Sequence, residues 1–147
     1  MRLFTIGYQG LTFDAFLRFL KLWNIGVVFD VRGNAISRKK GFSKYHLDKY
    51  LQVDSILYVH LPELGTPRPI RDELKKRGDY TQFFRMYNEF LEGKIDHLEP
   101  IIQAINIKNV ALMCFEKEIE KCHRGAIAAK IQEKTNHRVI IQNIRTS

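Results

Sequence analysis

Short apolar runs rich in β-branched residues alternate along the chain with segments whose apolar residues recur at helical spacing, and this alternation limits the fold most strongly. The run VVFDV, residues 27–31, is apolar at nearly every position, which is typical of a strand covered on both faces. Strands are predicted at residues 3–6, 27–31, 56–60, 110–114 and 139–142, and helices at residues 12–23, 44–52, 80–91, 96–105 and 123–134. This order predicts an α/β fold: a single three-layer domain, residues 1–147, with a mostly parallel sheet of about five strands flanked by helices.

One long segment interrupts the alternation. LPELGTPRPIRDELKKRGDY, residues 61–80, contains three prolines, which break regular structure, so an irregular connection is predicted here. Its basic residues between Arg68 and Arg77 are interleaved with Asp72 and Glu73, a pattern that an exposed, solvated helical face also explains.

The sequence favours a cytoplasmic protein that does not contact membranes. No apolar run approaches the ~20 residues of a membrane span, and the segment MRLFTIGYQG lacks the layout of a signal peptide. The chain has only two cysteines, which argues against a disulfide framework.

The charge balance favours an anionic partner. Lys and Arg number 24 against 16 Asp and Glu, a formal net charge of +8. Such a surface attracts an anionic small molecule or a nucleic acid, although surface charge also serves solvation. The oligomeric state does not follow from the sequence.

Chemically active residues follow three of the predicted strands. They are Asp30 and Arg32, His60 and Glu63, and Cys114 and Glu116. Ligands of open parallel sheets bind outside the carboxyl ends of the strands, so these residues are expected at one rim. The carboxylate of Asp30 needs a cationic partner at the end of an apolar strand, which makes Asp30 a positioning residue. His60 and Glu63 are also assigned structural or positioning roles, although Glu63, like Glu116, lies in a loop suited to proton transfer.

Both cysteines lie in the segment CFEKEIEKCHR, residues 114–124, before the last predicted helix. A helix N-terminus and Arg124 would favour the thiolate of Cys122, and His123 and Glu116 could transfer protons, so Cys114, Glu116, Cys122 and His123 are the candidate catalytic residues. Two plainer alternatives remain open: buried, inert thiols, and a reversible disulfide. A metal site is disfavoured, because C-x7-C-H is not a paired zinc spacing and adjacent Cys and His side chains rarely reach one ion.

The loop after the second predicted strand carries cations and no acidic residue. Arg32 and Arg38 in this loop, together with Arg124, are the candidate anion-binding residues, because guanidinium groups bind phosphate and carboxylate bidentately.

Several motifs together resemble a known family. The patterns DVR at residues 30–32, LGTP at residues 64–67 and C-x-E-x5-C-H-R at residues 114–124 occur in the order found in a prokaryotic family catalogued as domain of unknown function number four hundred and eighty-eight. That family usually begins with a glycine-histidine pair, whereas this chain has Gly7 followed by Tyr8. The resemblance supports the α/β fold and the choice of site, and it implies no assigned activity.

Two functions are therefore expected from different classes. The first is an enzyme, such as a cysteine-dependent hydrolase or transferase, that uses a Cys/His/Arg/Glu site on an anionic substrate and needs no cofactor. The second is a non-catalytic nucleic-acid-binding module with a basic surface, which would not need the clustered cysteines, histidine and arginine.

Overall fold

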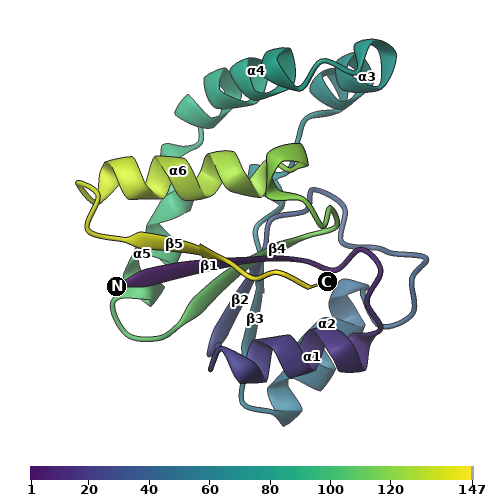
Figure 1. The fold of residues 1–147 in the computed structure, drawn as a ribbon, viewed down its shortest axis with the longest axis vertical. Coiled ribbons are helices and arrows are strands. Elements are labelled where there is room, and N and C mark those ends of the chain that lie inside the picture. The colour runs from purple at the N-terminus through teal and green to yellow at the C-terminus, as the bar shows by residue number, and fades with distance from the viewer. Residues whose placement is uncertain (147) are drawn as a thin grey trace.

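Five parallel strands form the centre of the molecule in the computed structural model, which describes residues 1–146. The strands are β1 (Arg2–Gly7), β2 (Val27–Asp30), β3 (Leu57–His60), β4 (Val110–Cys114) and β5 (Ile140–Asn143). Their order in the sheet is β3-β2-β4-β1-β5, and every neighbouring pair is parallel (Figure 1). The α/β prediction is confirmed, and the sheet is wholly rather than mostly parallel.

Helices cover both faces of this sheet and complete three layers (Figure 1). The helices are α1 (Phe13–Leu22), α2 (Lys44–Val53), α3 (Arg68–Arg77), α4 (Tyr80–Glu92), α5 (Glu99–Ile105) and α6 (Arg124–Lys134). Alternate residues of β4 point to opposite faces: Ala111 and Met113 pack with α1 and α2, while Val110, Leu112 and Cys114 pack with α4, α5 and α6. Cys114 therefore faces the layer that contains α6.

The first helix begins where its sequence predicts. Thr12 is its N-cap, and its side-chain oxygen accepts a hydrogen bond from the backbone N–H of Ala15. The second helix also begins as predicted after Ser43, but the Ser43 hydroxyl bonds to the backbone of Ser37 instead and fastens the basic loop.

The prediction of an irregular segment at residues 61–80 is wrong, because α3 occupies half of it. Pro67 and Pro69 lie at the start of this helix, where a missing backbone N–H costs no intrahelical bond. Gly78 ends the helix in a left-handed conformation, with φ of 66°. The prolines therefore position a helix over the end of the sheet.

Short 3-10 turns occur at three places, and one of them replaces the start of a predicted helix. Residues Ile95–Leu98 form a 3-10 turn (η2) before α5, inside the predicted helix 96–105. Residues Ile119–Lys121 form another (η3) between β4 and α6. A third (η1) covers Pro62–Leu64 after β3. Within the described part of the chain, no helix combines the length and apolar character needed to cross a membrane.

Candidate functional site

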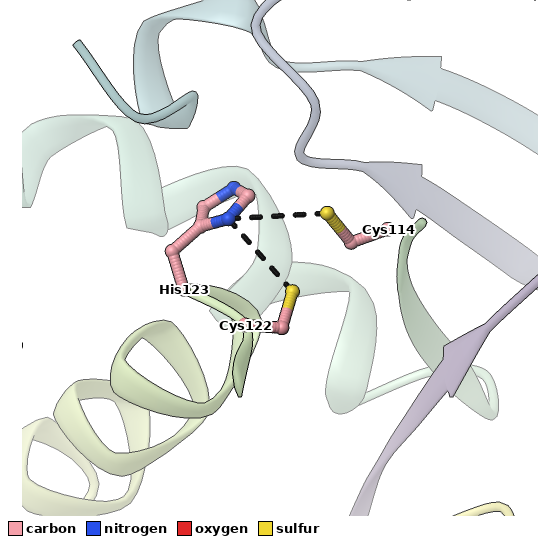
Figure 2. A group of neighbouring side chains, drawn as sticks. All are labelled: Cys114, Cys122 and His123. Carbon is pink, nitrogen blue, oxygen red and sulfur yellow. Dashed lines mark hydrogen bonds between the residues drawn. The ribbon is translucent and has the colours of Figure 1, made fainter. Parts of the chain in front are cut away.

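Cys114, Cys122 and His123 lie together where β4 ends and α6 begins (Figure 2). The Nδ1 atom of His123 is 3.8 Å from the sulfur of Cys114 and 3.8 Å from the sulfur of Cys122. All three residues are buried, and both cysteines are free thiols. Cys122 is extended and His123 begins α6, and this change of backbone conformation turns both neighbouring side chains toward Cys114.

The imidazole of His123 is held by its other nitrogen. Its Nε2 atom lies 2.7 Å from the carbonyl oxygen of Val31, so Nε2 carries a proton and donates it. The ring of Tyr87 packs edge-on against the imidazole, with centroids 5.3 Å apart, and the Tyr87 hydroxyl donates to the carbonyl of Leu64. These contacts direct Nδ1 toward the two sulfur atoms.

Each of these three groups shifts the pKa of its neighbours. Burial alone raises the pKa of the Cys122 thiol, but hydrogen bonds from Cys114 and His123 and the positive charge of His123 outweigh burial, so its pKa lies well below its ordinary value. The hydrogen bond to Cys122, together with burial, raises the pKa of the Cys114 thiol. Burial lowers the pKa of His123, but the hydrogen bond to Cys122 and the charge of Cys122 together outweigh burial. The net shift of the His123 pKa is therefore upward. A thiolate at Cys122 is therefore favoured over one at Cys114.

Glu116 stands beside this cluster. Its Oε2 atom is 3.6 Å from the sulfur of Cys114, which donates to it. Burial raises the pKa of Glu116, and the negative charge of Cys122 raises it further. A carboxyl group tuned in this direction can hold or release a proton nearer to neutral pH than an exposed glutamate can.

Asp30 is paired with Arg32. The Arg32 guanidinium donates from Nε to one oxygen of the fully buried carboxylate at 2.9 Å and from Nη2 to the other at 2.6 Å. Nη1 of Arg32 donates to the hydroxyl of Tyr8 at 2.9 Å, and the hydroxyl of Tyr58 donates to Asp30. Arg32 is only 6 % exposed and each of its side-chain nitrogens donates one hydrogen bond within the protein, and Arg32 also lines the pocket described below. Tyr8, the residue that departs from the family pattern, is part of this network.

The other two candidate anion-binding arginines, Arg124 and Arg38, differ in burial and in their surroundings. Arg124 is 2 % exposed, and its guanidinium donates to the backbone carbonyls of Glu116 at 2.5 Å and Lys117 at 3.2 Å. It fastens the loop that carries Glu116. Arg38 is exposed in the loop before α2 and does not line the pocket described below. The sequence could not show where the side chains of Arg124 and Arg38 lie, because their surroundings depend on how the loops fold together.

His60 and Glu63 lie outside the cluster. The Nε2 atom of His60 is 2.7 Å from the carbonyl oxygen of Arg32, so this histidine supports the end of β2. Glu63, in η1, has one buried carboxylate oxygen without a hydrogen-bond partner among the described residues. Neither residue lines the pocket above the cysteines.

A pocket of about 410 Å³ opens above the carboxyl ends of β1, β2 and β4. Cys114, Glu116 and His123 line it, whereas Cys122 is not among its lining residues. The remaining lining residues are Tyr8, Arg32, Gly33, Asn34, Thr66, Arg71, Leu74, Phe83, Phe115 and Lys121. Arg71 from α3 and Lys121 from η3 are the exposed cations of this wall, and sequence reasoning did not assign either to the site.

The wall that holds Asn34 and Thr66 depends on two glycines. A Cβ atom on Gly65 would lie 2.2 Å from Cα of Gly33, so the loops after β2 and β3 meet backbone to backbone. The LGTP pattern at residues 64–67 was the available signal for this contact. It was recognised only as a family motif, and it did not show which loop this segment would meet.

Comparison with known proteins identifies the family of the chain. Neither a search of curated proteins nor a search of solved structures gave a significant match. The family model described as "Domain of unknown function DUF488" matches residues 12–131, which include β2, β4 and the whole Cys114–Arg124 segment. The chain is therefore a member of the DUF488 family.

Proposed function

We propose that this protein is an enzyme that acts on an anionic, phosphate-containing or nucleic-acid-related substrate, with Cys114, Cys122, His123 and Glu116 as its reactive groups. One observation carries the proposal: Cys114, His123 and Glu116 line the same pocket as two exposed cations, Arg71 and Lys121. An anion held by these cations lies next to the sulfur and the carboxylate, as proton or group transfer requires.

The other walls of the pocket suit a substrate with a flat apolar part. Phe115 is 42 % exposed, and its ring packs edge-on against Tyr8 with centroids 5.4 Å apart. Both rings line the pocket, as does Phe83 on α4. A nucleobase has a π-face that such rings can contact, which favours a nucleotide over a simple inorganic anion.

The binding half of the proposal is tested with two matched arginine variants. Affinities for pyrophosphate and for a panel of nucleoside mono- and diphosphates are measured by calorimetry at low ionic strength. Arg71→Gln is expected to weaken binding about tenfold or more, since a hydrogen bond to a charged group contributes about 1.5–3 kcal/mol. Arg38→Gln removes the same charge from a loop that does not line the pocket and is expected to change affinity less than threefold. Equal effects of the two variants would overturn the assignment of this pocket.

The catalytic half is tested with the ligands that bind. Turnover is followed by phosphate release and by mass spectrometry, with wild-type protein and with Glu116→Gln and Cys114→Ser. Loss of turnover with retained binding is expected for both variants. Tight binding by wild-type protein without turnover of any bound ligand would contradict catalysis.

The alternative, a nucleic-acid-binding module, draws on the net charge of +8 and on the exposed basic residues of α3. It predicts that affinity for RNA or DNA falls steeply with added salt and that Cys114→Ser and Glu116→Gln leave this affinity unchanged. The enzyme proposal instead predicts turnover that both variants remove, so one set of proteins separates the two functions.

A further inference from the structure

Three metal-ligand atoms converge beside the pocket, and two of the residues that carry them line it. The sulfurs of Cys114 and Cys122 and Nδ1 of His123 all lie within 4.8 Å of one another (Figure 2). Ordinary zinc distances of about 2.3 Å to sulfur and about 2.0–2.1 Å to nitrogen, with tetrahedral angles, place sulfur and nitrogen about 3.6 Å apart. Both observed separations between Nδ1 and a sulfur are 3.8 Å, close to that value. Adjacent Cys and His side chains were expected to reach one ion only rarely, whereas the ligand atoms of Cys122 and His123 lie 3.8 Å apart here.

The orientation of His123 also suits a metal ligand. Histidines that bind metals usually donate their second ring N–H to a carbonyl or carboxylate, which fixes the ring. Nε2 of His123 donates to the carbonyl oxygen of Val31 at 2.7 Å, so Nδ1 is the atom directed at the sulfurs.

A hydrogen bond from or to Nδ1 of His123 can include only one of the two sulfur atoms. Nδ1 has one lone pair or one proton, so it can join only one of the two sulfurs, which lie at equal distances from it. A single cation between them is bound by all three atoms at once. Two thiolates with one imidazole form a borderline-soft ligand set that selects zinc over magnesium or calcium.

We propose that Cys114, Cys122 and His123 bind a zinc ion whose fourth coordination position faces the pocket. Two of the three ligands, Cys114 and His123, line the pocket, so a ligand in the pocket can reach the ion on that side. Three protein ligands and an open position are typical of catalytic rather than structural zinc sites. The inference rests on the proposed function for its substrate, but the metal binding can be measured alone.

Glu116 is placed to act beside that open position. Its Oε2 atom is 3.6 Å from the sulfur of Cys114, and it also lines the pocket. With zinc bound, the ion would supply an activated water at its open position, and Glu116 would be the residue that accepts a proton from that water. Glu116 is then a proton acceptor and not a ligand.

Cobalt titration of the reduced, chelator-treated protein tests the site. Wild-type protein is expected to bind one Co²⁺ per chain, with thiolate-to-cobalt absorption in the near ultraviolet and the intense visible bands of a tetrahedral ion, and Zn²⁺ is expected to bleach both. Cys114→Ser and His123→Asn are expected to lose about 100-fold or more in affinity. Glu116→Gln and Arg38→Gln are expected to stay within about threefold of wild type, because neither side chain is a ligand.

Wild-type protein alone can overturn the proposal. Absence of thiolate-to-cobalt absorption, or only the weak bands of an octahedral ion, would exclude the site even where a variant fails to fold. Calorimetry with pyrophosphate on the same samples, with and without Zn²⁺, separates the two proposals. Anion binding and turnover without cobalt absorption would overturn the metal site alone, whereas a tetrahedral cobalt spectrum without anion binding would overturn the proposed function alone.

Discussion

Both carboxylate oxygens of Asp30 accept hydrogen bonds from the guanidinium of Arg32, two residues further along the chain. The carboxylate is fully buried and the arginine is nearly so. The same carboxylate also accepts a hydrogen bond from the backbone N–H of Arg32, and Tyr8 and Tyr58 complete the hydrogen bonds of the pair. The rim of the pocket therefore depends on a buried ion pair.

Asp30→Asn is expected to lower the free energy of unfolding by about 3–5 kcal/mol, because it leaves the Arg32 cation buried without its counter-charge. Asp72→Asn is the control, since it breaks an exposed pair with Arg68 and is expected to cost no more than about 0.5 kcal/mol. Urea unfolding of the two variants measures the difference. Similar costs would show that the buried pair adds nothing special to stability.

Gly7→Ala is expected to cost at least about 3 kcal/mol, because overpacking of a close backbone contact forces the chain to move. A Cβ atom on Gly7 would lie 1.8 Å from the carbonyl oxygen of Glu116. Gly93→Ala is the control: its Cβ would lie 3.5 Å from the carbonyl oxygen of Phe90, and its φ is −80°. Thermal unfolding compares the two, and a Gly7→Ala protein as stable as Gly93→Ala would contradict the close approach.

Arg124→Gln is expected to loosen the loop between β4 and α6 and to lower stability by about 2–4 kcal/mol. The substitution removes two charged hydrogen bonds to the carbonyls of Glu116 and Lys117. Hydrogen exchange at residues 115–121 is expected to accelerate. Arg138→Gln, which removes a bond to the carbonyl of Thr135 at the end of α6, is expected to leave exchange in that loop unchanged.

Zinc is expected to raise the thermal unfolding midpoint of the wild-type protein and of Arg38→Gln, but not of Cys114→Ser. At a free zinc concentration 100 times the dissociation constant, the added stability is about 2.7 kcal/mol, because only the folded chain assembles the site. Differential scanning fluorimetry with and without a chelator measures the shift. An equal shift in Cys114→Ser would show that zinc binds elsewhere.

Sequence periodicity was sufficient to predict the strands, most of the helices and the α/β fold. Residues 110–114 are a strand with the predicted bounds, and Thr12 caps α1 as its hydroxyl suggests. The rule that parallel strands end at one rim correctly brought residues of β2 and β4 to the same edge, where they meet the start of α6. These features depend on local pattern and on chain direction, both of which can be read from the sequence.

The contacts between loops could not be predicted in this way. Arg32, Arg38 and Arg124 were assigned together by their charge, yet two of them bind groups of the protein itself and the third lies apart from the pocket. Arg71 reaches the pocket only because Pro67 and Pro69 begin a helix instead of preventing one. Which partner a long cationic side chain meets is decided by tertiary packing, which local spacing does not encode.

The position of β4 in the sheet has a consequence for how the chain matures during synthesis. β1 and β2 each pair with β4 and not with each other, although they are made first. A nascent chain that ends before residue 110 therefore has two early strands with no shared neighbour, and half of the molecule waits on a segment translated late. A chain that stops before residue 110 therefore lacks both the strand that lies between β1 and β2 and the two cysteines of the site.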